Sequence, residues 1–365
     1  MNRRDIFRLG AGMAGLGLFG SAARAGGSAA AAGFFIPDEK VPHERTFMQW
    51  PVSAEVYGGS GLLKPAQKTI AAIANAITEF EPVVMLMDQR YQADARNLLG
   101  ASVEIWDIPT DDLWCRDSGP AFVIDGRGGL AVTQFNFNGW GNKQPHPNDG
   151  KIAERVAARL GLSVFDVGLV GEAGGVESDG AGTLIAHESS WINRNRNRGG
   201  RADVERRLLE TMGAEKVIWA PGLKDHDITD YHIDALARFV EPGRVLIQLG
   251  DAVDENDPWS VASHETYDRL AAATDAHGRK LDLVVLSDPQ DIRVQSDDFV
   301  ASYVNYYVCN GGVIAAEFGD RAADARAASL LGDLYPGREV VTLNVDALGK
   351  IGGGIHCATH EQPRV

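Results

Sequence analysis

Apolar runs and amphipathic stretches alternate along most of the chain. Runs rich in apolar and aromatic residues, each beside glycine or proline turns, occupy residues 46–50, 119–137, 182–191, 233–249 and 303–318. Such runs are typical of buried strands. Between them, apolar residues recur at helical spacing, as Ile70, Ile73 and Ile77 do. The pattern therefore predicts an α/β protein.

The predicted helices and further strands repeat in the same order. Helices are expected over residues 65–80, 148–160, 201–212, 263–277 and 322–334, and strands over residues 83–87, 216–219, 282–286 and 339–343. The apolar runs recur at intervals of roughly 60 residues, which indicates a repeated supersecondary unit. Five similar units favour a closed ring, although periodicity alone also fits a doubly wound sheet. We therefore expect a single domain over residues 37–365.

The amino end has the layout of an export signal. Arg3 and Arg4 precede a short, glycine-rich apolar stretch, and residues 23–25 form a small-x-small cleavage site. The apolar stretch is shorter than the roughly 20 residues that a membrane span needs. We predict a twin-arginine signal peptide over residues 1–25, a linker over residues 26–36, no stable membrane span, and a periplasmic or secreted protein. A disordered basic tail is the alternative.

Charge and cysteine content narrow the class of protein. The formal net charge of −15 argues against nucleic acid as a partner and suits a small cationic substrate. Cys115, Cys309 and Cys357 are odd in number and lack CxxC spacing, so neither a disulfide framework nor a cysteine metal site is expected. The oligomeric state stays open, a homo-oligomer included.

A glycine run precedes the last cysteine. Gly352, Gly353 and Gly354 remove the side chains just ahead of Cys357, so a substrate could approach that backbone closely. The same run also fits an ordinary tight turn. Three motifs elsewhere supply the partners that a reactive cysteine needs, and they favour the chemical interpretation.

The first motif contains His232 and Asp234. In a strand, residues two apart project from the same face, so this imidazole and this carboxylate would stand side by side. A buried salt-linked pair is the structural alternative. Asp225, Asp227 and Asp230 precede the pair and are expected in a solvated loop.

The second motif contains Trp114, Arg116 and Asp117. Neighbours in extended chain face opposite ways, so Arg116 and Asp117 are expected to have different roles. One division places Asp117 in the cavity and Arg116 in the scaffold. Trp114 would then offer a flat face to a cation or an alkyl chain. The alternative is an aromatic core residue beside a surface ion pair.

The third motif begins at Glu172, a candidate carboxylate for the site. Asp179 and Gly180 follow it and predict a hairpin turn. The basic run at residues 193–198 is interpreted as a solvated loop rather than an anion site.

Together these four motifs resemble the agmatine deiminase and bacterial-type peptidylarginine deiminase family, from residue 47 to residue 363. The resemblance implies the pentein fold, an α/β propeller of five ββαβ-like units around a pseudo-fivefold axis. It also implies a single catalytic domain that requires no metal or organic cofactor. The functional residues that it implies are Cys357 as nucleophile, His232, Asp234 and Asp117 as further catalytic groups, and Asp117, Glu172 and Asp234 as substrate-binding residues. The flat face of Trp114 adds this residue to the substrate-binding set.

Elementary chemistry explains why these residue types suit a guanidinium substrate. Asp117 and Asp234 can hold the planar cation by paired hydrogen bonds, with its central carbon against the Cys357 thiolate. His232 can protonate the departing nitrogen and then activate water, which resolves a covalent S-alkylthiouronium. The resemblance implies that agmatine and water become N-carbamoylputrescine and ammonia, in polyamine metabolism.

Two other functions stay open. A peptidylarginine deiminase would need an open cleft and an arginine for a peptide carboxylate, for which Arg194, Arg196 and Arg198 are candidates. A non-catalytic guanidino-binding protein would need the acids but not Cys357. A cysteine protease is disfavoured, because paired acids repel the oxyanion of peptide cleavage.

The sequence departs from the family pattern in three places. Tyr231 stands where glycine usually precedes the histidine, and a phenol there would recontour the cavity. Ala173 replaces a common glycine beside Glu172. His360 replaces a usual glutamine and is expected to have a packing or surface role rather than a catalytic one.

Overall fold

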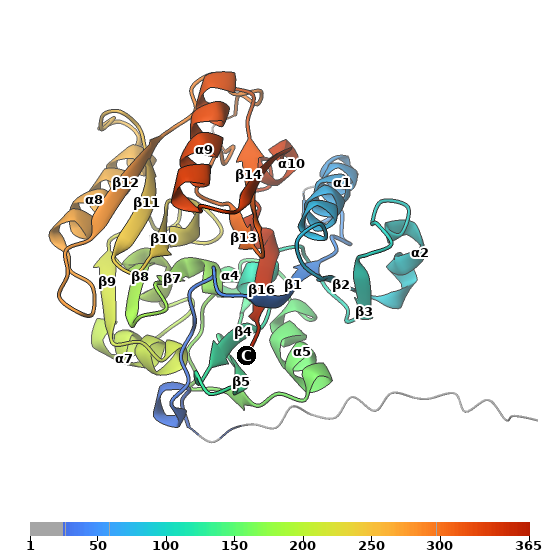
Figure 1. The fold of residues 1–365 in the computed structure, drawn as a ribbon, viewed down its shortest axis with the longest axis horizontal. Helices are drawn as coiled ribbons and strands as arrows, with labels where there is room; N and C mark the ends of the chain where they lie inside the picture. The colour runs from blue at the N-terminus through green and yellow to red at the C-terminus, as the bar shows by residue number, and fades with distance from the viewer. Residues whose placement is uncertain (1–24, 26, 58, 297) are drawn as a thin grey trace, which may run out of the picture.

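The computed structural model describes residues 25, 27–57, 59–296 and 298–365, which form five small sheets arranged in a ring (Figure 1). The first sheet contains β16 (Thr359–Pro363), β1 (His43–Gln49), β2 (Val83–Met87) and β3 (Glu104–Asp107). The other four sheets, in chain order, are β4 (Ala121–Ile124), β5 (Leu130–Thr133) and β6 (Val164–Phe165); β7 (Val176–Ser178), β8 (Thr183–His187) and β9 (Lys216–Ala220); β10 (Ala237–Glu241), β11 (Arg244–Leu249) and β12 (Asp282–Ser287); and β13 (Tyr307–Cys309), β14 (Gly312–Glu317) and β15 (Glu339–Asn344).

Every sheet repeats one unit. An inner strand pairs antiparallel with the next strand, which pairs parallel with the one after it. The helices that make the parallel crossovers are α1 (Ser60–Ile77), α5 (Ile152–Leu160), α7 (Arg201–Met212), α8 (Pro258–Ala272) and α9 (Arg321–Leu334). These helices lie around the outside of the ring, and β16, β4, β7, β10 and β13 lie toward its centre (Figure 1). The structure thus confirms the α/β class and the five repeated units.

The two ends of the chain complete one unit together. β16 supplies the inner strand of the first sheet and pairs with β1, so that His360 lies opposite Phe47. The periodic residues Ile70, Ile73 and Ile77 of α1 are fully buried, at about 1.5–3 kcal/mol of stabilisation each. Ring closure therefore brings the cysteine that precedes β16 to the centre.

Two helices were predicted out of register. α1 spans Ser60–Ile77 rather than residues 65–80, and Pro65 lies inside it. α8 begins at Pro258, five residues before the predicted start, because the Asp257 side chain caps the helix by accepting a hydrogen bond from the Trp259 amide. The remaining short helices are η1 (Ala30–Ala32), η2 (Gln89–Tyr91), α2 (Gln92–Ala95), α3 (Cys115–Ser118), α4 (Gly139–Asn142), η3 (Asp149–Lys151), η4 (Ala173–Gly175), α6 (Glu188–Trp191), η5 (Ile233–Ala235), α10 (Asp346–Gly349) and η6 (His356–Ala358).

The segment predicted as a linker packs onto the ring over its described part, residues 27–36. Phe34 packs against Phe165 with ring centroids 5.3 Å apart, and Phe35 forms a β-bridge with Ile124. These aromatic side chains bury apolar surface, which a free linker would leave in water. The predicted export signal lies outside the described residues except for Ala25. No helix in the described ranges is long and apolar enough to cross a membrane.

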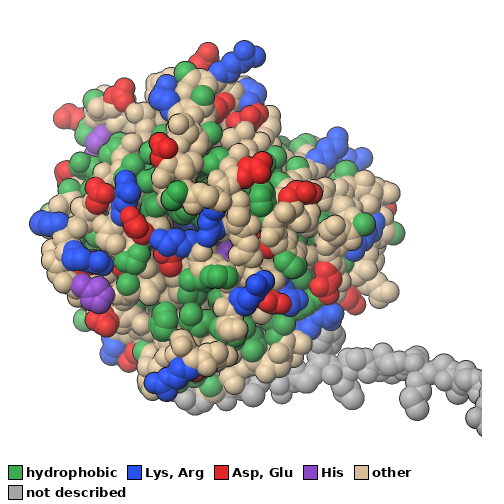
Figure 2. All heavy atoms as spheres, in the orientation of Figure 1, with side chains coloured by type: hydrophobic (Ala, Val, Ile, Leu, Met, Phe, Trp, Pro, Cys, Tyr) green, Lys and Arg blue, Asp and Glu red, His purple; other side chains and the backbone are tan. Residues whose placement is uncertain are grey.

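Acidic and basic side chains are interspersed over the face of the molecule in Figure 2.

Candidate active site

Each of the five units contributes one short turn to the centre of the ring. The turns are α3, η4, η5, residues 302–305 and η6, and each lies just before the inner strand of its unit. α3 contacts η6 and η4, and η4 contacts η5. Residues far apart in sequence therefore meet because they occupy equivalent positions in successive units. The side chains brought together are those of Asp117, Glu172, His232, Asp234, Asn305 and Cys357.

Cys357 is partly exposed, whereas the polar side chains around it are buried. Its Sγ lies 3.1 Å from Asn305 Nδ2 and 3.5 Å from Asp234 Oδ2. Burial raises the pKa of the thiol well above its ordinary value, and the carboxylates of Asp234 and Asp117 raise it further. Before a substrate binds, the sulfur is therefore a neutral thiol.

His232 lies between two acids. Its Nε2 is 3.2 Å from Glu172 Oε2, and its Nδ1 is 3.6 Å from Asp117 Oδ1. Burial acts to lower the pKa of His232, but Asp117 and Glu172 outweigh it and raise the pKa to about 9. The imidazole is consequently protonated at neutral pH and can act as a general acid.

Asp117 and Asp234 converge beside His232. A Cβ added to Gly174 would lie 2.7 Å from Asp117 Oδ1, 2.9 Å from His232 Nδ1 and 3.2 Å from Asp234 Oδ2, so only glycine fits there. Asp117 accepts hydrogen bonds from Trp140 Nε1 at 2.8 Å and from the Gly174 amide at 3.3 Å. Burial raises the pKa of Asp117 to about 6.

Asp234 has one bound and one free oxygen. Its Oδ2 lies 2.7 Å from His356 Nδ1. Burial acts to raise the pKa of Asp234, but His356, His232 and Arg238 together outweigh it and hold the pKa below its usual value. Its Oδ1 is buried and has no hydrogen-bond partner among the residues that the structure describes. A buried, ionised oxygen without a partner is costly, which points to a ligand with N–H or O–H groups.

The folded body matches a known family over nearly its whole length. The sequence pattern of the Porphyromonas-type peptidyl-arginine deiminase family matches residues 35–363. The chain belongs to this family. The family placement predicted from the motifs is thereby confirmed.

Relatives within this deiminase family are similar over most of their length. The agmatine deiminase of Pseudomonas aeruginosa is 35% identical, with 91% of this chain and 96% of the relative covered. The agmatine deiminase of Ectopseudomonas mendocina is 34% identical, with the same coverage of 91% and 96%. The solved structure described as the agmatine deiminase of Enterococcus faecalis catalysing its reaction has a TM-score of 0.87 at 28% identity, covering 94% of this chain and 100% of that one. This likeness confirms the pentein fold.

Two local predictions for this deiminase were wrong. His232 and Asp234 do not lie in a strand: they flank Ile233 at the 3₁₀ turn η5, and Asp234 bonds His356 rather than His232. Asp117 lies in a single helical turn, not in extended chain. The backbone turns at both places because each lies just before the inner strand of its unit, where the chain changes direction to enter the sheet.

Arg116 and Asp117 nevertheless point to different partners, as predicted. Arg116 is buried and bonds Glu39 at 3.1 Å and Glu361 at 2.9 Å. This ion pair is buried in the scaffold, so the surface alternative does not apply. Burial acts to lower the pKa of Arg116, but both acids outweigh it and keep the guanidinium charged.

The glycine run makes room for side chains. A Cβ on Gly353 would lie 2.5 Å from the Trp114 ring, and one on Gly354 would lie 2.5 Å from Asn305 Oδ1. Trp114 is 9% exposed and packs in the largest apolar cluster, so most of its surface serves the core. Its predicted role in substrate binding stays a prediction.

The prediction of solvated loops was wrong for Arg196 and Asp230. The Arg196 side chain is fully buried, and its Nε lies 2.9 Å from both oxygens of Glu172. Its other nitrogens bond Asp230 Oδ2 at 2.7 Å and the Thr229 carbonyl at 3.0 Å. Arg196 and His232 together outweigh burial and hold the pKa of Glu172 below its usual value. Arg194 and Arg198, two positions away on either side, are exposed.

The departures from the family pattern lie in the packing around the site. Tyr231 has a φ of 70°, a conformation that favours the glycine usual at this position. Its ring packs between His187 and Trp259, at centroid distances of 4.6 and 4.8 Å. His360 is buried and bonds the Cys115 carbonyl at 3.2 Å, which confirms its packing role. Burial lowers the pKa of His360 to about 4.

Sequence reasoning missed four side chains around Cys357. Asn305 contacts Cys357, and Trp140 bonds Asp117. His356 bridges Asp234 to Glu39, whose Oε2 lies 2.8 Å from His356 Nε2. Only His356 carried a signal, because it directly precedes the cysteine.

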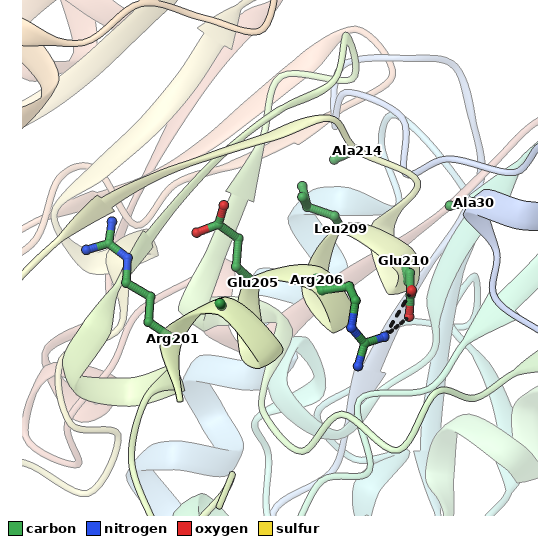
Figure 3. A pocket seen from close by; sticks show the side chains of 8 residues that line it. Ala30, Arg201, Glu205, Arg206, Leu209, Glu210 and Ala214 are labelled. Carbon is green, nitrogen blue, oxygen red and sulfur yellow. Dashed lines mark hydrogen bonds and ion pairs between the residues drawn. The ribbon is translucent and has the colours of Figure 1, made fainter. Parts of the chain in front are cut away.

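A surface hollow over α7 is separate from this site. Figure 3 shows the side chains that line it, among them Arg201, Glu205 and the Arg206–Glu210 ion pair of 2.9 Å. None of the site residues described above borders it. Within the described ranges, no group of three His, Cys, Asp or Glu side chains is arranged to hold a metal ion.

The hairpin predicted at Asp179 and Gly180 is confirmed between β7 and β8, where the Asp179 carboxylate accepts bonds from the amides of Ala181 and Thr183 at 2.8 Å.

Proposed function

We propose that this enzyme hydrolyses the guanidinium group of agmatine, with ammonia and N-carbamoylputrescine as products. The observation that carries the proposal is the convergence of two buried carboxylates and a cationic imidazole on a thiol, with Asp234 Oδ1 unpaired within the described residues. A planar guanidinium can supply the missing hydrogen bonds to Asp117 and Asp234. Two relatives that are named agmatine deiminase, and whose alignments cover 91% of this chain, support the same substrate.

The charges around Cys357 before a substrate binds are suited to activation of the thiol by the substrate itself. Burial is the main cause of the raised pKa of the Cys357 thiol, and the carboxylates of Asp234 and Asp117 raise it further. The negative charge of these two acids therefore opposes formation of the thiolate. A guanidinium bound between them offsets that charge and lowers the thiol pKa. The thiol proton then leaves to water, and the thiolate forms where its electrophile is already bound.

The reaction proceeds through a covalent intermediate on Cys357. The thiolate attacks the guanidinium carbon and a C–S bond forms; His232 then gives its proton to the departing nitrogen, the C–N bond breaks and ammonia leaves. An S-alkylthiouronium remains on the sulfur. The neutral His232 next takes a proton from water as that water attacks the carbon. The C–S bond breaks as the hydroxyl proton of the adduct passes to water, and the urea product leaves. The thiolate then takes a proton from water, which restores the thiol.

The buried arginines around the site are already paired with acids, which favours agmatine over substrates that carry a carboxylate. Arg116, Arg196 and Arg238 each contact two buried or largely buried acids. A carboxylate of arginine or of a peptide would have to compete with those acids. Agmatine carries no carboxylate and needs no such cation.

The proposed setting is an exported enzyme that supplies a putrescine precursor outside the cytoplasm. Support comes from the twin arginines and the small-x-small site ahead of residue 26. Cell fractionation with N-terminal sequencing tests this setting. A cytoplasmic protein that begins at Met1 would contradict it.

Ammonia release from agmatine, free arginine and an arginyl peptide tests the activity. We expect turnover of agmatine alone, its loss in Cys357→Ala, and its retention in Cys309→Ala, which removes a buried thiol from β13. Preference for the peptide would replace the proposal with peptidylarginine deimination. Agmatine binding without any ammonia release would leave a guanidino-binding protein.

A further inference from the structure

We propose that Asn305 is a catalytic residue, whose side-chain amide donates a hydrogen bond to the sulfur of Cys357 and stabilises its thiolate. The inference deepens the proposed function and rests on it, because it assumes that Cys357 reacts as a thiolate. Asn305 is 1% exposed and lies in the turn before β13. β13 is the inner strand of the one unit for which the sequence predicted no site residue.

The hydrogen bonds fix which end of the amide faces the sulfur. Oδ1 accepts a bond from the Cys357 backbone N–H at 3.2 Å, which only an oxygen can do. Nδ2 therefore faces Sγ at 3.1 Å and the Asp234 carbonyl at 3.3 Å, both of which are acceptors. A flipped amide would place its NH₂ group against the Cys357 N–H. The donor is thus aimed at the sulfur by its own contacts.

A neutral donor is the group that this position needs. A lysine or arginine beside Sγ would stabilise the thiolate, but it would also repel the guanidinium and pair with Asp234. An amide N–H stabilises the sulfur at every pH and leaves both carboxylates to the substrate. The Gly354 backbone also lowers the pKa of the thiol by hydrogen bonding, and the missing side chain at Gly354 leaves room for the Asn305 amide.

The pH dependence of thiol alkylation by iodoacetamide tests this role without any substrate. A hydrogen bond to a charged group is worth about 1.5–3 kcal/mol, so its loss should slow alkylation of Cys357 at a fixed pH about 10- to 100-fold. Asn305→Ala removes both ends of the amide. Asn305→Asp keeps the oxygen for the Cys357 N–H and replaces the donor with an acceptor. Reactions of Cys115 and Cys309 are subtracted with Cys357→Ala.

The two variants separate a donor from a merely structural group. We expect Asn305→Asp to react as slowly as Asn305→Ala, or more slowly. Recovery of wild-type alkylation by Asn305→Asp, or no slowing in Asn305→Ala, would overturn the inference.

Asn310→Ala is the matched control, because Asn310 also bonds the main chain through both ends of its amide, to His43 at 2.9 Å each. Its alkylation rate should stay at the wild-type value, and a fall equal to that of Asn305→Ala would overturn the inference. The readout is independent of agmatine. Normal thiol reactivity without ammonia release in the wild type would refute the proposed function and leave this test intact.

Discussion

Replacing Arg196 by methionine should destabilise the fold strongly, because the guanidinium holds two buried acids. The side chains of Arg196 and Asp230 are fully buried, and that of Glu172 is 1% exposed. After the substitution, Asp230 keeps Lys143 at 2.8 Å, and Glu172 Oε2 keeps His232. Glu172 Oε1 loses its guanidinium partner. Removal of one member of a buried ion pair costs about 3–5 kcal/mol, and we expect a loss in this range.

The pH dependence of the stability loss in Arg196→Met is a second test, because the direction of its change with pH follows from the pKa of Glu172. In the wild type, Arg196 and His232 together outweigh burial and lower the pKa of Glu172, so Glu172 stabilises the fold above its ordinary titration range. In Arg196→Met, His232 remains but the guanidinium no longer offsets burial, so the pKa of Glu172 rises. The penalty is then present at neutral pH and is relieved as acid protonates Glu172. The difference in stability between wild type and variant should therefore shrink from about pH 7 to about pH 4.

Equilibrium urea unfolding measures both effects. Arg206→Met is the matched control, since Arg206 is 56% exposed and pairs with Asp203 and Glu210 on the surface of α7. Its loss should stay within about 1 kcal/mol. Equal, small losses for the two variants would refute the argument that Arg196 compensates buried charge.

Three further outcomes are expected. Calorimetric binding of agmatine to Cys357→Ala should weaken as pH falls through about 6, since protonation of Asp117 removes one clamp; binding that is constant across this range would contradict it. His232→Gln should lower kcat about 10²- to 10⁴-fold yet still bind agmatine, because the general acid is lost and the clamps remain; unchanged kcat would exclude that role. Gly353→Ala should cost about 1–3 kcal/mol in urea unfolding, since its Cβ would meet the Trp114 ring at 2.5 Å. Gly200→Ala, with no atom within 4 Å of its Cβ, is the control, and similar losses for both would contradict the steric reason.

The repeated pattern predicted the fold well, because each unit buries its own helix and strands. The spacing of Ile70, Ile73 and Ile77 identified the buried face of α1, and all three are fully buried. The pairing of β16 with β1 joins the two ends of the chain, and no local pattern reports such a contact. Phe34 and Phe35 show the same limit, since their glycine- and alanine-rich surroundings indicated a linker.

The sequence predicted the site only for residue types that are commonly catalytic, such as cysteine, histidine and aspartate. Cys357, His232 and the two aspartates stand out in the sequence, and the ring brings them together. Asn305 and Arg196 do not stand out, because an amide and an arginine near polar neighbours normally face water. Their burial depends on contacts between units, from Arg196 to Asp230, 34 residues apart in the chain, and from Asn305 to Cys357, 52 residues apart.

The most direct test of the account is intact-mass analysis of the protein quenched in acid during turnover of agmatine. The account predicts a transient species heavier by agmatine less ammonia, located on Cys357 by peptide mapping and absent from Cys357→Ala. Steady ammonia release without any adduct, in wild type and in a variant slowed at His232, would contradict covalent catalysis by Cys357.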